Sequence, residues 1–414
     1  MSSSLPVLVI GAGAGGLGAA RTLADAGVPV LVIEARNRIG GRAHTVLSPG
    51  GDPIDHGCGW LHSATENPMV AIAEREGFTV DRLTPPWQRR SATPGFSETD
   101  QAAFGAAIDR FDERLVEARG QDDRPASAML EPGNRWNPLI DAVSTWYSGA
   151  ELDLVSAEDL DRYDDNGRNW RVREGYGRLI ETLGRGLDIR LGVRAEAVRH
   201  DGRTLTVETS RGTIEASAVV VALPSAVLAT GALRFHPALP DKIEAADALP
   251  LGLADKLTFR LDDADGFEAD RAVFGRTDTR RTASYTFRPS GFAQVECYFG
   301  GALAYDLERD DARAFETFAL EELSALYGAD IRRRLHALPM TLWGREPESL
   351  GSYSYARPGM ARMRERLAEP VGERLFFAGE AVSPTHYSTA HGAYLTGVEA
   401  ARRIVAARHG EIAA

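Results

Sequence analysis

The run from Val7 to Arg42 constrains the possible folds of this 414-residue chain more than any other segment. It opens with the apolar residues VLVI, bounded by glycine, which is typical of a strand buried in a parallel sheet. A GxGxxG turn and an alanine-rich helical segment follow. A second apolar run, from Val30 to Ile33, ends in Glu34. This order of strand, glycine turn, helix, strand and acid predicts a Rossmann-like nucleotide-binding unit.

Each glycine of the turn has its own physical task. Gly11 permits the tight turn, Gly13 lets the backbone approach a pyrophosphate, and Gly16 lets the helix pack closely on the strand. The helix directs free N–H groups and a positive dipole end at the phosphates. Glu34 is placed to accept hydrogen bonds from the hydroxyl groups of a ribose. The sequence therefore predicts a dinucleotide site at this edge of the sheet.

A second glycine turn follows Glu34, where a nicotinamide-binding domain would continue into its next helix. It consists of Ile39-Gly-Gly41-Arg42 and is preceded by Arg36. Its N–H groups and the two guanidinium groups suit a pyrophosphate. The pattern EARxRxGGR resembles the glutathione-reductase-like flavoproteins, in particular the flavin amine oxidases. The resemblance implies tightly held FAD and no separate NAD domain.

Composition disfavours several classes of partner. The net charge is −12, with acids spread along the chain, which disfavours nucleic acid and anionic membrane surfaces. No stretch approaches the about 20 apolar residues of a membrane helix, and the N-terminus lacks a signal-peptide pattern. Cys58, Cys297 and the histidines show no metal-site spacing. We expect a cytoplasmic protein without a metal, nucleic-acid or membrane partner, and the oligomeric state is not readable from the sequence.

Periodicity outlines the rest of the chain. Apolar residues at helical spacing predict helices from Phe104 to Gly120 and from Phe315 to Gly328, and polar, proline-rich residues 84–95 predict a loop. Strands are predicted at 205–209, 218–223, 257–261 and 293–299. Near the C-terminus a strand, a glycine and an acid recur at 375–381, followed by a helix predicted over 389–407 whose N-terminus would face the flavin.

Nucleotide-site sequence at both ends predicts an α/β fold in which two domains are interleaved. One is a Rossmann-like FAD-binding domain made of residues 1–80, 186–246 and 340–414. The other is an α+β substrate-binding domain made of residues 81–185 and 247–339.

Four motifs in order resemble the flavin amine oxidase family over most of the chain. They are the N-terminal fingerprint with DHGCGWLH at 55–62, RLGVR at 190–194 with VVVALP at 219–224, WGREP at 343–347 with GSYSY at 351–355, and FAGEA at 377–381 with YSTAHGAY at 387–394. On this resemblance the chain is identified as a member of the family, and its last motif is closer to the polyamine oxidases.

The resemblance implies a set of cofactor-binding residues. They are Gly11, Gly13, Gly16, Glu34, Ala35, Arg36, Gly41, Arg42, Gly59, Trp60, Val193, Trp343, Gly379, Glu380, Thr389 and Ala390. Ser352 stands where monoamine oxidases carry the cysteine that bonds FAD covalently. We therefore expect non-covalent FAD.

Three residues are expected to be catalytic. Lys256 lies where the family has the lysine that hydrogen-bonds a water at flavin N5, although a surface lysine beside Asp255 is the alternative. If buried there, its pKa would be lowered by desolvation, and the neutral amine could take a proton or orient water. Tyr353 resembles one wall of the family's aromatic cage, whose second wall is replaced by Ala390. His62 resembles a histidine of the polyamine oxidase substrate tunnel.

The resemblance implies an FAD-dependent amine oxidase. A hydride would pass from the amine α-carbon to flavin N5, O2 would reoxidise the flavin to give H2O2, and water would hydrolyse the imine to an aldehyde. The expected substrate is a polyamine or another aliphatic or secondary amine. Three alternatives stay open: an L-amino acid oxidase, which needs an arginine aimed at a carboxylate, a biosynthetic amine oxidase acting on a natural-product intermediate, and a non-catalytic FAD-binding interaction protein.

Overall fold

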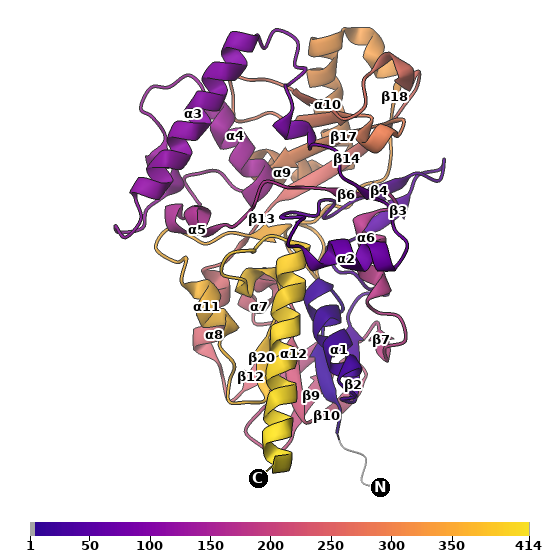
Figure 1. Ribbon diagram of the computed structural model, residues 1–414, viewed down its shortest axis with the longest axis vertical. Coiled ribbons are helices and arrows are strands. Elements are labelled where there is room, and N and C mark those ends of the chain that lie inside the picture. Colours follow the sequence, from indigo (N-terminus) through magenta and orange to yellow (C-terminus); the bar gives the residue numbers. More distant parts are fainter. Residues whose placement is uncertain (1–4, 414) are drawn as a thin grey trace.

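A computed structural model describes residues 5–413, with side chains described to residue 408. The lower part of the molecule holds a five-stranded parallel sheet (Figure 1). Its strands, in spatial order, are β20 (Leu375–Phe377), β11 (Ala218–Val221), β1 (Val7–Ile10), β2 (Val30–Glu34) and β7 (Ile189–Leu191). Every residue of β1 and β11 is buried, as expected for strands covered on both faces.

Helices α1 (Ala14–Asp25) and α12 (Ala390–Ala413) lie side by side against one face of this sheet (Figure 1). Glycine lets them approach closely. A Cβ at Gly18 would lie 2.8 Å from the side chain of Tyr394, and one at Gly397 would lie 1.9 Å from the carbonyl oxygen of Gly15. Helices α1 and α12, from the N-terminal and C-terminal parts of the chain, therefore pack directly against each other beside the strands of the predicted nucleotide site.

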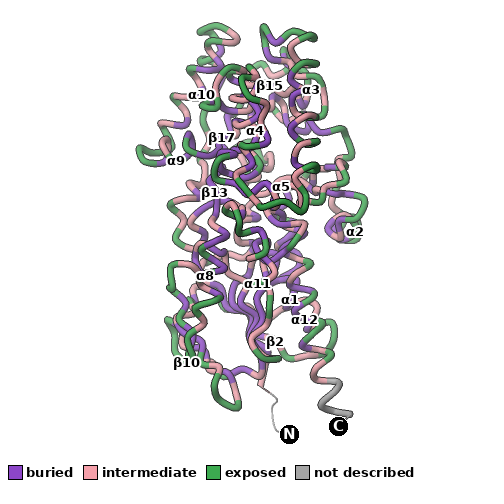
Figure 2. The backbone as a smooth tube through the Cα atoms, turned by 90° about the vertical axis from the view of Figure 1, so that its left-hand side faces the viewer, coloured by how far each residue is buried: buried purple, intermediate pink, exposed green. Residues whose placement is uncertain are grey.

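The opposite face of the parallel sheet shares a core with a second, four-stranded sheet. Leu8 and Ile33 of the parallel sheet pack there with Val198 and Val207. The buried strands run between α8 on one side and α1 and α12 on the other (Figure 2). The surrounding elements are β10 (Gly212–Ala216), β9 (Leu205–Thr209), β8 (Ala195–Arg199), β12 (Arg234–His236), α7 (Ser225–Ala229), α8 (Pro240–Asp247) and α11 (Met363–Ala368).

The upper part is built on a five-stranded antiparallel sheet with two different faces. Because side chains alternate along a strand, Leu257, Cys297 and Phe299 point to one face and pack with Phe315 of α10. Polar residues occupy the other face. The elements are β15 (Arg271–Phe274), β16 (Ser284–Phe287), β17 (Gln294–Gly300), β14 (Ala254–Leu261), β18 (Leu335–Ala337), α3 (Glu98–Glu117), α4 (Asn137–Ser148), α9 (Gly301–Asp310) and α10 (Ala312–Tyr327).

Smaller elements connect the two parts. They are β3 (Thr45–Leu47), β4 (Pro53–Asp55), α2 (Pro68–Arg75), β5 (Val80–Asp81), α5 (Ala157–Arg162), β6 (Arg171–Val172), α6 (Tyr176–Thr182), β13 (Leu251–Gly252) and β19 (Tyr353–Ser354). The predicted helices and strands are present, with shifted ends: β11 stops at Val221, before Pro224, and α12 begins at Ala390. The domain boundaries stay a prediction.

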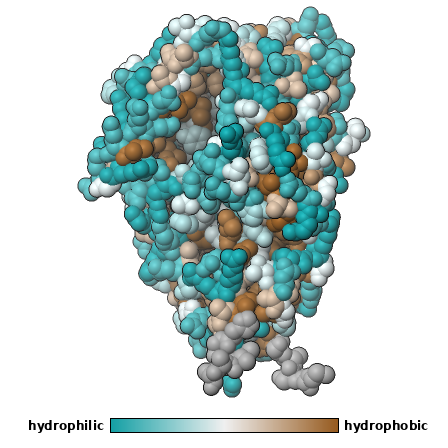
Figure 3. Space-filling view, viewed as in Figure 1, coloured by the Kyte–Doolittle hydropathy of each residue, from teal (hydrophilic) through white to brown (hydrophobic). Residues whose placement is uncertain are grey.

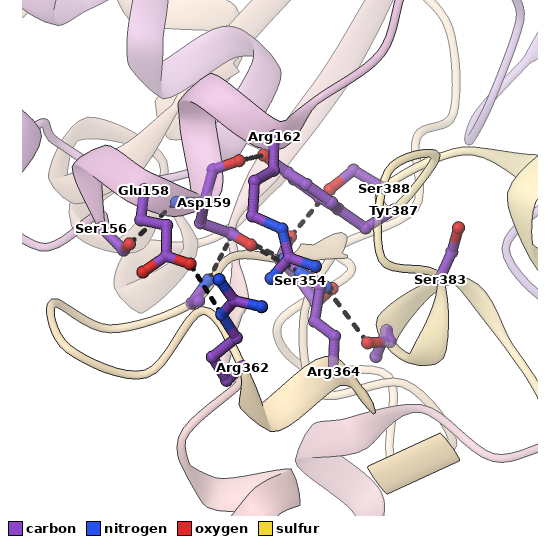
Figure 4. Close-up of polar contacts among 12 residues, drawn as sticks. Ser156, Glu158, Asp159, Arg162, Ser354, Arg362, Arg364, Ser383, Tyr387 and Ser388 are labelled. Carbon is purple, nitrogen blue, oxygen red and sulfur yellow. Dashed lines mark hydrogen bonds and ion pairs between the residues drawn. The ribbon is translucent and has the colours of Figure 1, made fainter. Parts of the chain in front are cut away.

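A buried ion pair crosses between the parts (Figure 4). The guanidinium of Arg364, on α11, donates from Nε and Nη2 to the two carboxylate oxygens of Asp159, on α5, both at 2.7 Å. Its Nη1 donates to Ser354 Oγ at 2.9 Å, and its Cζ lies 3.7 Å from the ring centroid of Tyr387. Arg364 is fully buried, so this fork ties α11 to α5.

Among residues 5–413, none of the helices combines the length and the apolar character that a bilayer-spanning segment needs.

Candidate active site

One cavity of about 880 Å³ lies at the junction of the two parts. It extends from the glycine turns after β1 and β2, past the polar face of the antiparallel sheet, to α3 and α4. In the space-filling view, hydrophobic residues gather in a recess over the region of α3 and α4 (Figure 3). Every residue expected to bind cofactor or substrate lines this cavity except Gly16.

Gly16 lies beneath the turn rather than in the cavity wall. A Cβ there would lie 1.8 Å from the carbonyl oxygen of Gly11, which agrees with the packing task expected of this glycine. The two glycine turns meet, since a Cβ at Gly41 would lie 3.1 Å from Cα of Gly13. No side chain intervenes at that point, so backbone N–H groups at the start of α1 are open to the cavity. We call this space between the turns at Gly13 and Gly41 the glycine cradle. Its shape and its N–H groups fit a pyrophosphate.

Backbone N–H groups of the neighbouring turns hydrogen-bond to the Glu34 carboxylate and fix it at the end of β2. Its Oε2 accepts a hydrogen bond from Ala12 N at 2.8 Å, and its Oε1 accepts one from Arg36 N at 2.9 Å. Val193 N donates to the Glu34 carbonyl oxygen at 2.9 Å. Each carboxylate oxygen keeps a second lone pair for a hydroxyl group.

Glu380 and Arg42 join the second glycine turn to the C-terminal motif. Arg42 Nη1 donates to Glu380 Oε1 and to the Ser352 carbonyl oxygen, both at 2.8 Å. Burial raises the pKa of the Glu380 carboxyl, but Arg42 and Ser354 lower it more, and the net pKa lies below its ordinary value. The Arg42 guanidinium is therefore oriented by a carboxylate and not free to rotate.

The first turn of α12 also faces the cavity. Thr389, Ala390 and Ala393 line it, and Thr389 Oγ1 accepts a hydrogen bond from Gly392 N at 3.0 Å. The helix therefore presents its positive dipole end to this space.

Lys256 is buried in the cavity wall, so the surface alternative is wrong: the residue is 7% exposed. Its Nζ lies 3.7 Å from Glu296 Oε2 and 5.5 Å from the ring centroid of Tyr298. Burial alone lowers its pKa, but Glu296, Tyr298 and Asp55 raise it more, and the net pKa lies above its ordinary value. The expectation of a lowered pKa is therefore also wrong, because the sheet supplies Lys256 with a carboxylate partner.

Tyr353 belongs to a chain of aromatic groups. Its hydroxyl lies 3.1 Å from the hydroxyl of Tyr298 and donates to the carbonyl oxygen of Trp146. The ring of Trp146 stacks on Phe274 with centroids 5.6 Å apart. All four side chains line the cavity. Aromatic surface thus continues from Tyr353 toward α4 and β15.

His62 lies in another part of the same wall. Its Nδ1 is 2.9 Å from Asn169 Oδ1 and 3.4 Å from Asp165 Oδ2. Trp60, two residues earlier, has the guanidinium of Arg171 4.2 Å from its ring centroid. Thus His62, Lys256 and Tyr353 all face one space from three segments of the chain.

A buried acid, Asp255, supports Trp343. Trp343 Nε1 donates to the His56 carbonyl oxygen at 2.9 Å, and its backbone N donates to Asp255 Oδ1 at 3.1 Å. Asp255 is fully buried, and its Oδ2 has no hydrogen-bond partner among residues 5–408. Burial first, and then the neighbouring Glu308, raise the pKa of Asp255 well above its ordinary value.

We expect Asp255→Asn to change how stability depends on pH. Above about pH 4 the unfolded chain loses the Asp255 proton while the folded protein keeps it, so the wild type is destabilised as the pH rises. The asparagine cannot titrate and still accepts from Trp343. The variant should therefore gain stability over the wild type by up to about 1.4 kcal/mol per pH unit. Urea unfolding at several pH values measures this, with Asp201→Asn at an exposed site as the control. Parallel pH curves for the wild type and Asp255→Asn would contradict it.

Sequence reasoning missed several residues of this wall. They are Arg171, Glu296, Tyr298, Trp146, Phe274, Asp165 and Asn169. Strand alternation at 293–299 indicated one face for Glu296 and Tyr298, but only the register with β14 brings them to Lys256. The others come from segments without a recognisable motif.

Comparison with known proteins identifies the family. Residues 14–94 and 113–405 match the family described as flavin containing amine oxidoreductase. The chain belongs to this family. Polyamine oxidase 2 of Arabidopsis thaliana is 33% identical over 98% of this chain and 90% of its own length. The prediction of the family from four motifs is confirmed.

Solved structures agree with the fold. The cyclohexylamine oxidase of Brevibacterium oxydans IH-35A superposes with a TM-score of 0.81 at 21% identity, covering 98% of this chain and 100% of that one. A double mutant of a putrescine oxidase gives 0.79 at 18% identity, covering 97% and 99%. The predicted Rossmann-like fold class is confirmed. As a family member the chain is an FAD-dependent oxidoreductase that acts on amines.

Proposed function

We propose that this oxidoreductase oxidises an aliphatic amine, a polyamine or another secondary amine, in the cavity between α4 and the antiparallel sheet. The observation that carries the proposal is the meeting of Lys256, Tyr298 and Tyr353 in the wall of a cavity that also contains both glycine turns. Polyamine oxidase 2, the relative named above, supports the substrate class. The proposal includes O2 as electron acceptor and the cytoplasm as location.

The glycine cradle, Glu34, Arg36 and Arg42 would hold the FAD, without a covalent bond because position 352 is a serine. Bound FAD supplies a two-electron acceptor for the hydride of the amine α-carbon and passes the electrons to O2. Tyr353 and Tyr298 would orient the amine, because their electron-rich rings attract its nitrogen. Lys256 would provide positive charge and a proton beside the reacting atoms. His62 would hold a second polar group of the substrate.

The charge of Arg171 argues against an L-amino acid as substrate. Arg171 is an arginine of the wall whose charge acts on Lys256, and its side chain is 12% exposed. Glu296 lies 3.4 Å and Asp270 3.5 Å from its guanidinium. Two carboxylates already compensate its charge, so a substrate carboxylate would meet no free cation there.

The part of the cavity that α3, α4 and β15 line favours a second class of substrate. The walls contributed by α3, α4 and β15 are largely apolar, formed by Phe104, Ile108, Phe111, Val143, Trp146 and Phe274, and Asp112 of α3 adds one carboxyl group. Apolar walls favour an amine with an apolar substituent, because burying that group releases ordered water. A ring amine or an aryl-substituted natural-product intermediate would satisfy this condition, whereas free spermine would place an ammonium group among mostly apolar side chains, near a single carboxyl group, that of Asp112.

The test is reduction of the bound flavin without oxygen. The purified holoenzyme is mixed with spermidine, spermine, putrescine, N-benzylputrescine, cyclohexylamine and L-amino acids, and bleaching of the flavin band is followed. We expect amines, and not amino acids, to bleach the flavin. Bleaching by L-amino acids alone, or by none of the panel while dithionite still reduces the flavin, would overturn the proposal. Preference for N-benzylputrescine over spermidine would select the second candidate.

A further inference from the structure

Glu296 is a carboxylate of the cavity wall to which the chemistry above gives no task. Its Oε2 lies 3.7 Å from Lys256 Nζ, and its Oε1 accepts a hydrogen bond from Arg171 at 3.4 Å. The antiparallel register pairs Glu296 with Thr258 and Tyr298 with Lys256. Glu296 therefore stands diagonally opposite Lys256 on the same face of the sheet.

A second, small cavity lies on the other side of Glu296. Its volume is about 50 Å³, which is room for a few water molecules. Trp60, Arg171 and Glu296 line both cavities and so form a wall between them. The small cavity is polar, with Asp55 and Gln294 among its lining residues.

Gln294 marks this small cavity as a place for water. The residue is 4% exposed, and its Nε2 has no hydrogen-bond partner among the described side chains and backbone. A buried amide donor without a partner costs about 1–3 kcal/mol, whereas a bridging water satisfies it. Gln294 does not reach the large cavity. Water held here would contact Glu296 without entering the amine-binding space.

We propose that Glu296 carries protons between Lys256 and water in the small cavity. The inference rests on the proposed amine oxidation for its purpose. Reduction of O2 to H2O2 takes up two electrons and two protons. The hydride of the amine accounts for both electrons and one proton, so one further proton is needed. One N–H bond of the Lys256 ammonium breaks and gives its proton to the reduced oxygen. Glu296, which is ionised at first, then binds a solvent proton delivered through the water of the small cavity. It passes this proton from Oε2 to the Lys256 nitrogen, so that the carboxylate and the ammonium are both restored. Glu296 is thus a positioning residue that acts through Lys256.

The charges around Glu296 link its protonation state to that of Lys256. Burial raises the pKa of Glu296, but Lys256 and Arg171 lower it more, so the carboxylate is ionised while Lys256 is an ammonium. Once Lys256 has lost its proton, one of these two cations is gone and Glu296 binds a proton more readily. The other titratable groups near the pair are Asp55, Asp270, Tyr298 and His56.

The first test measures reoxidation and uses no amine. Holoenzyme is reduced with dithionite and mixed with O2 in H2O and in D2O over a range of pH. We expect Glu296→Gln and Gln294→Leu each to slow reoxidation, by about tenfold for Glu296→Gln, with a larger solvent isotope effect than in the wild type. Glu215→Gln is the control, since it makes the same change at an exposed carboxylate that lines neither cavity. Unchanged reoxidation in Gln294→Leu, or in both variants, would overturn the proposal.

The second test observes Lys256 itself. The chain has only two lysines, Lys242 and Lys256, so lysine labelled with ¹³C at Cε gives two NMR signals, and Lys242→Met assigns them. We expect Glu296→Gln to move the Lys256 titration down by about one pH unit or more and to leave that of Lys242 unchanged. An unmoved Lys256 titration would overturn the proposal. Because neither test uses an amine, failure of every amine to bleach the flavin would count against the proposed function alone.

Discussion

Replacing Arg364 with methionine will lower the free energy of unfolding by about 3–5 kcal/mol, because it leaves the carboxylate of Asp159 buried without its cation. Both oxygens of Asp159 are engaged by the Arg364 fork, and the two side chains are 1% and 0% exposed (Figure 4). Methionine preserves much of the length and apolar volume of arginine, so the loss measures mainly the missing charge and hydrogen bonds. Urea unfolding followed by fluorescence, with flavin bound, gives the value.

A neighbouring ion pair is the control for this experiment. Arg362 donates to Glu158 at 2.9 Å, but its side chain is 76% exposed. Arg362→Met should therefore change stability by less than about 1 kcal/mol. The double variant Arg364→Met/Asp159→Asn should recover part of the loss, because no buried charge remains unpaired. A loss in Arg364→Met no larger than that in Arg362→Met would show that the buried fork contributes little to stability.

Lys256→Met will slow reoxidation of the reduced flavin by about 100-fold, the second large effect we expect. Negative charge develops on oxygen as O2 is reduced, and the Lys256 ammonium is a cation of the cavity wall beside the ring of Tyr298. Methionine has a similar length and no charge. Stopped-flow mixing of dithionite-reduced enzyme with O2 measures the rate.

The only other lysine provides the matched control. Lys242 lies outside the cavity, where its Nζ donates to the carbonyl oxygens at the end of α11, including that of Leu367 at 3.2 Å. Lys242→Met should therefore leave reoxidation of the folded, flavin-loaded protein unchanged. If Lys256→Met reoxidises within about threefold of the wild type, Lys256 has another task than the one assigned to it.

The N-terminal turn could be predicted from the sequence, whereas the contact between the N-terminal and C-terminal motifs could not. The strand, turn and helix around Gly11 and Gly16 follow from local spacing, since the position of each glycine in the turn sets what the backbone can approach. The meeting of Arg42 with Glu380 was expected only in outline. Both residues were assigned to the cofactor, but their 2.8 Å ion pair joins residues 338 positions apart and depends on the tertiary structure.

The direction in which the pKa of Lys256 is shifted could not be predicted from the sequence. Desolvation is a local expectation for a buried lysine and predicts a lowered pKa. The net effect depends on Glu296 and Asp55, which lie on other strands. Their distance from Lys256 is set by strand register and by the approach of β4, and neither is encoded in residues next to Lys256 in the chain.

The sequence by itself determined the family, the parallel sheet with its glycine turns, and nearly all of the predicted cofactor residues that line the cavity, because these depend on short motifs whose spacing carries their geometry. Only the tertiary structure decided the chemistry of the substrate side: the Glu296 partner of Lys256, the compensated charge of Arg171, the Tyr298–Tyr353 contact and the small polar cavity. The physical reason is that these contacts join β6, β14, β17 and β19. Their pairing and packing arise from the fold as a whole, and no local pattern specifies which side chains finally meet.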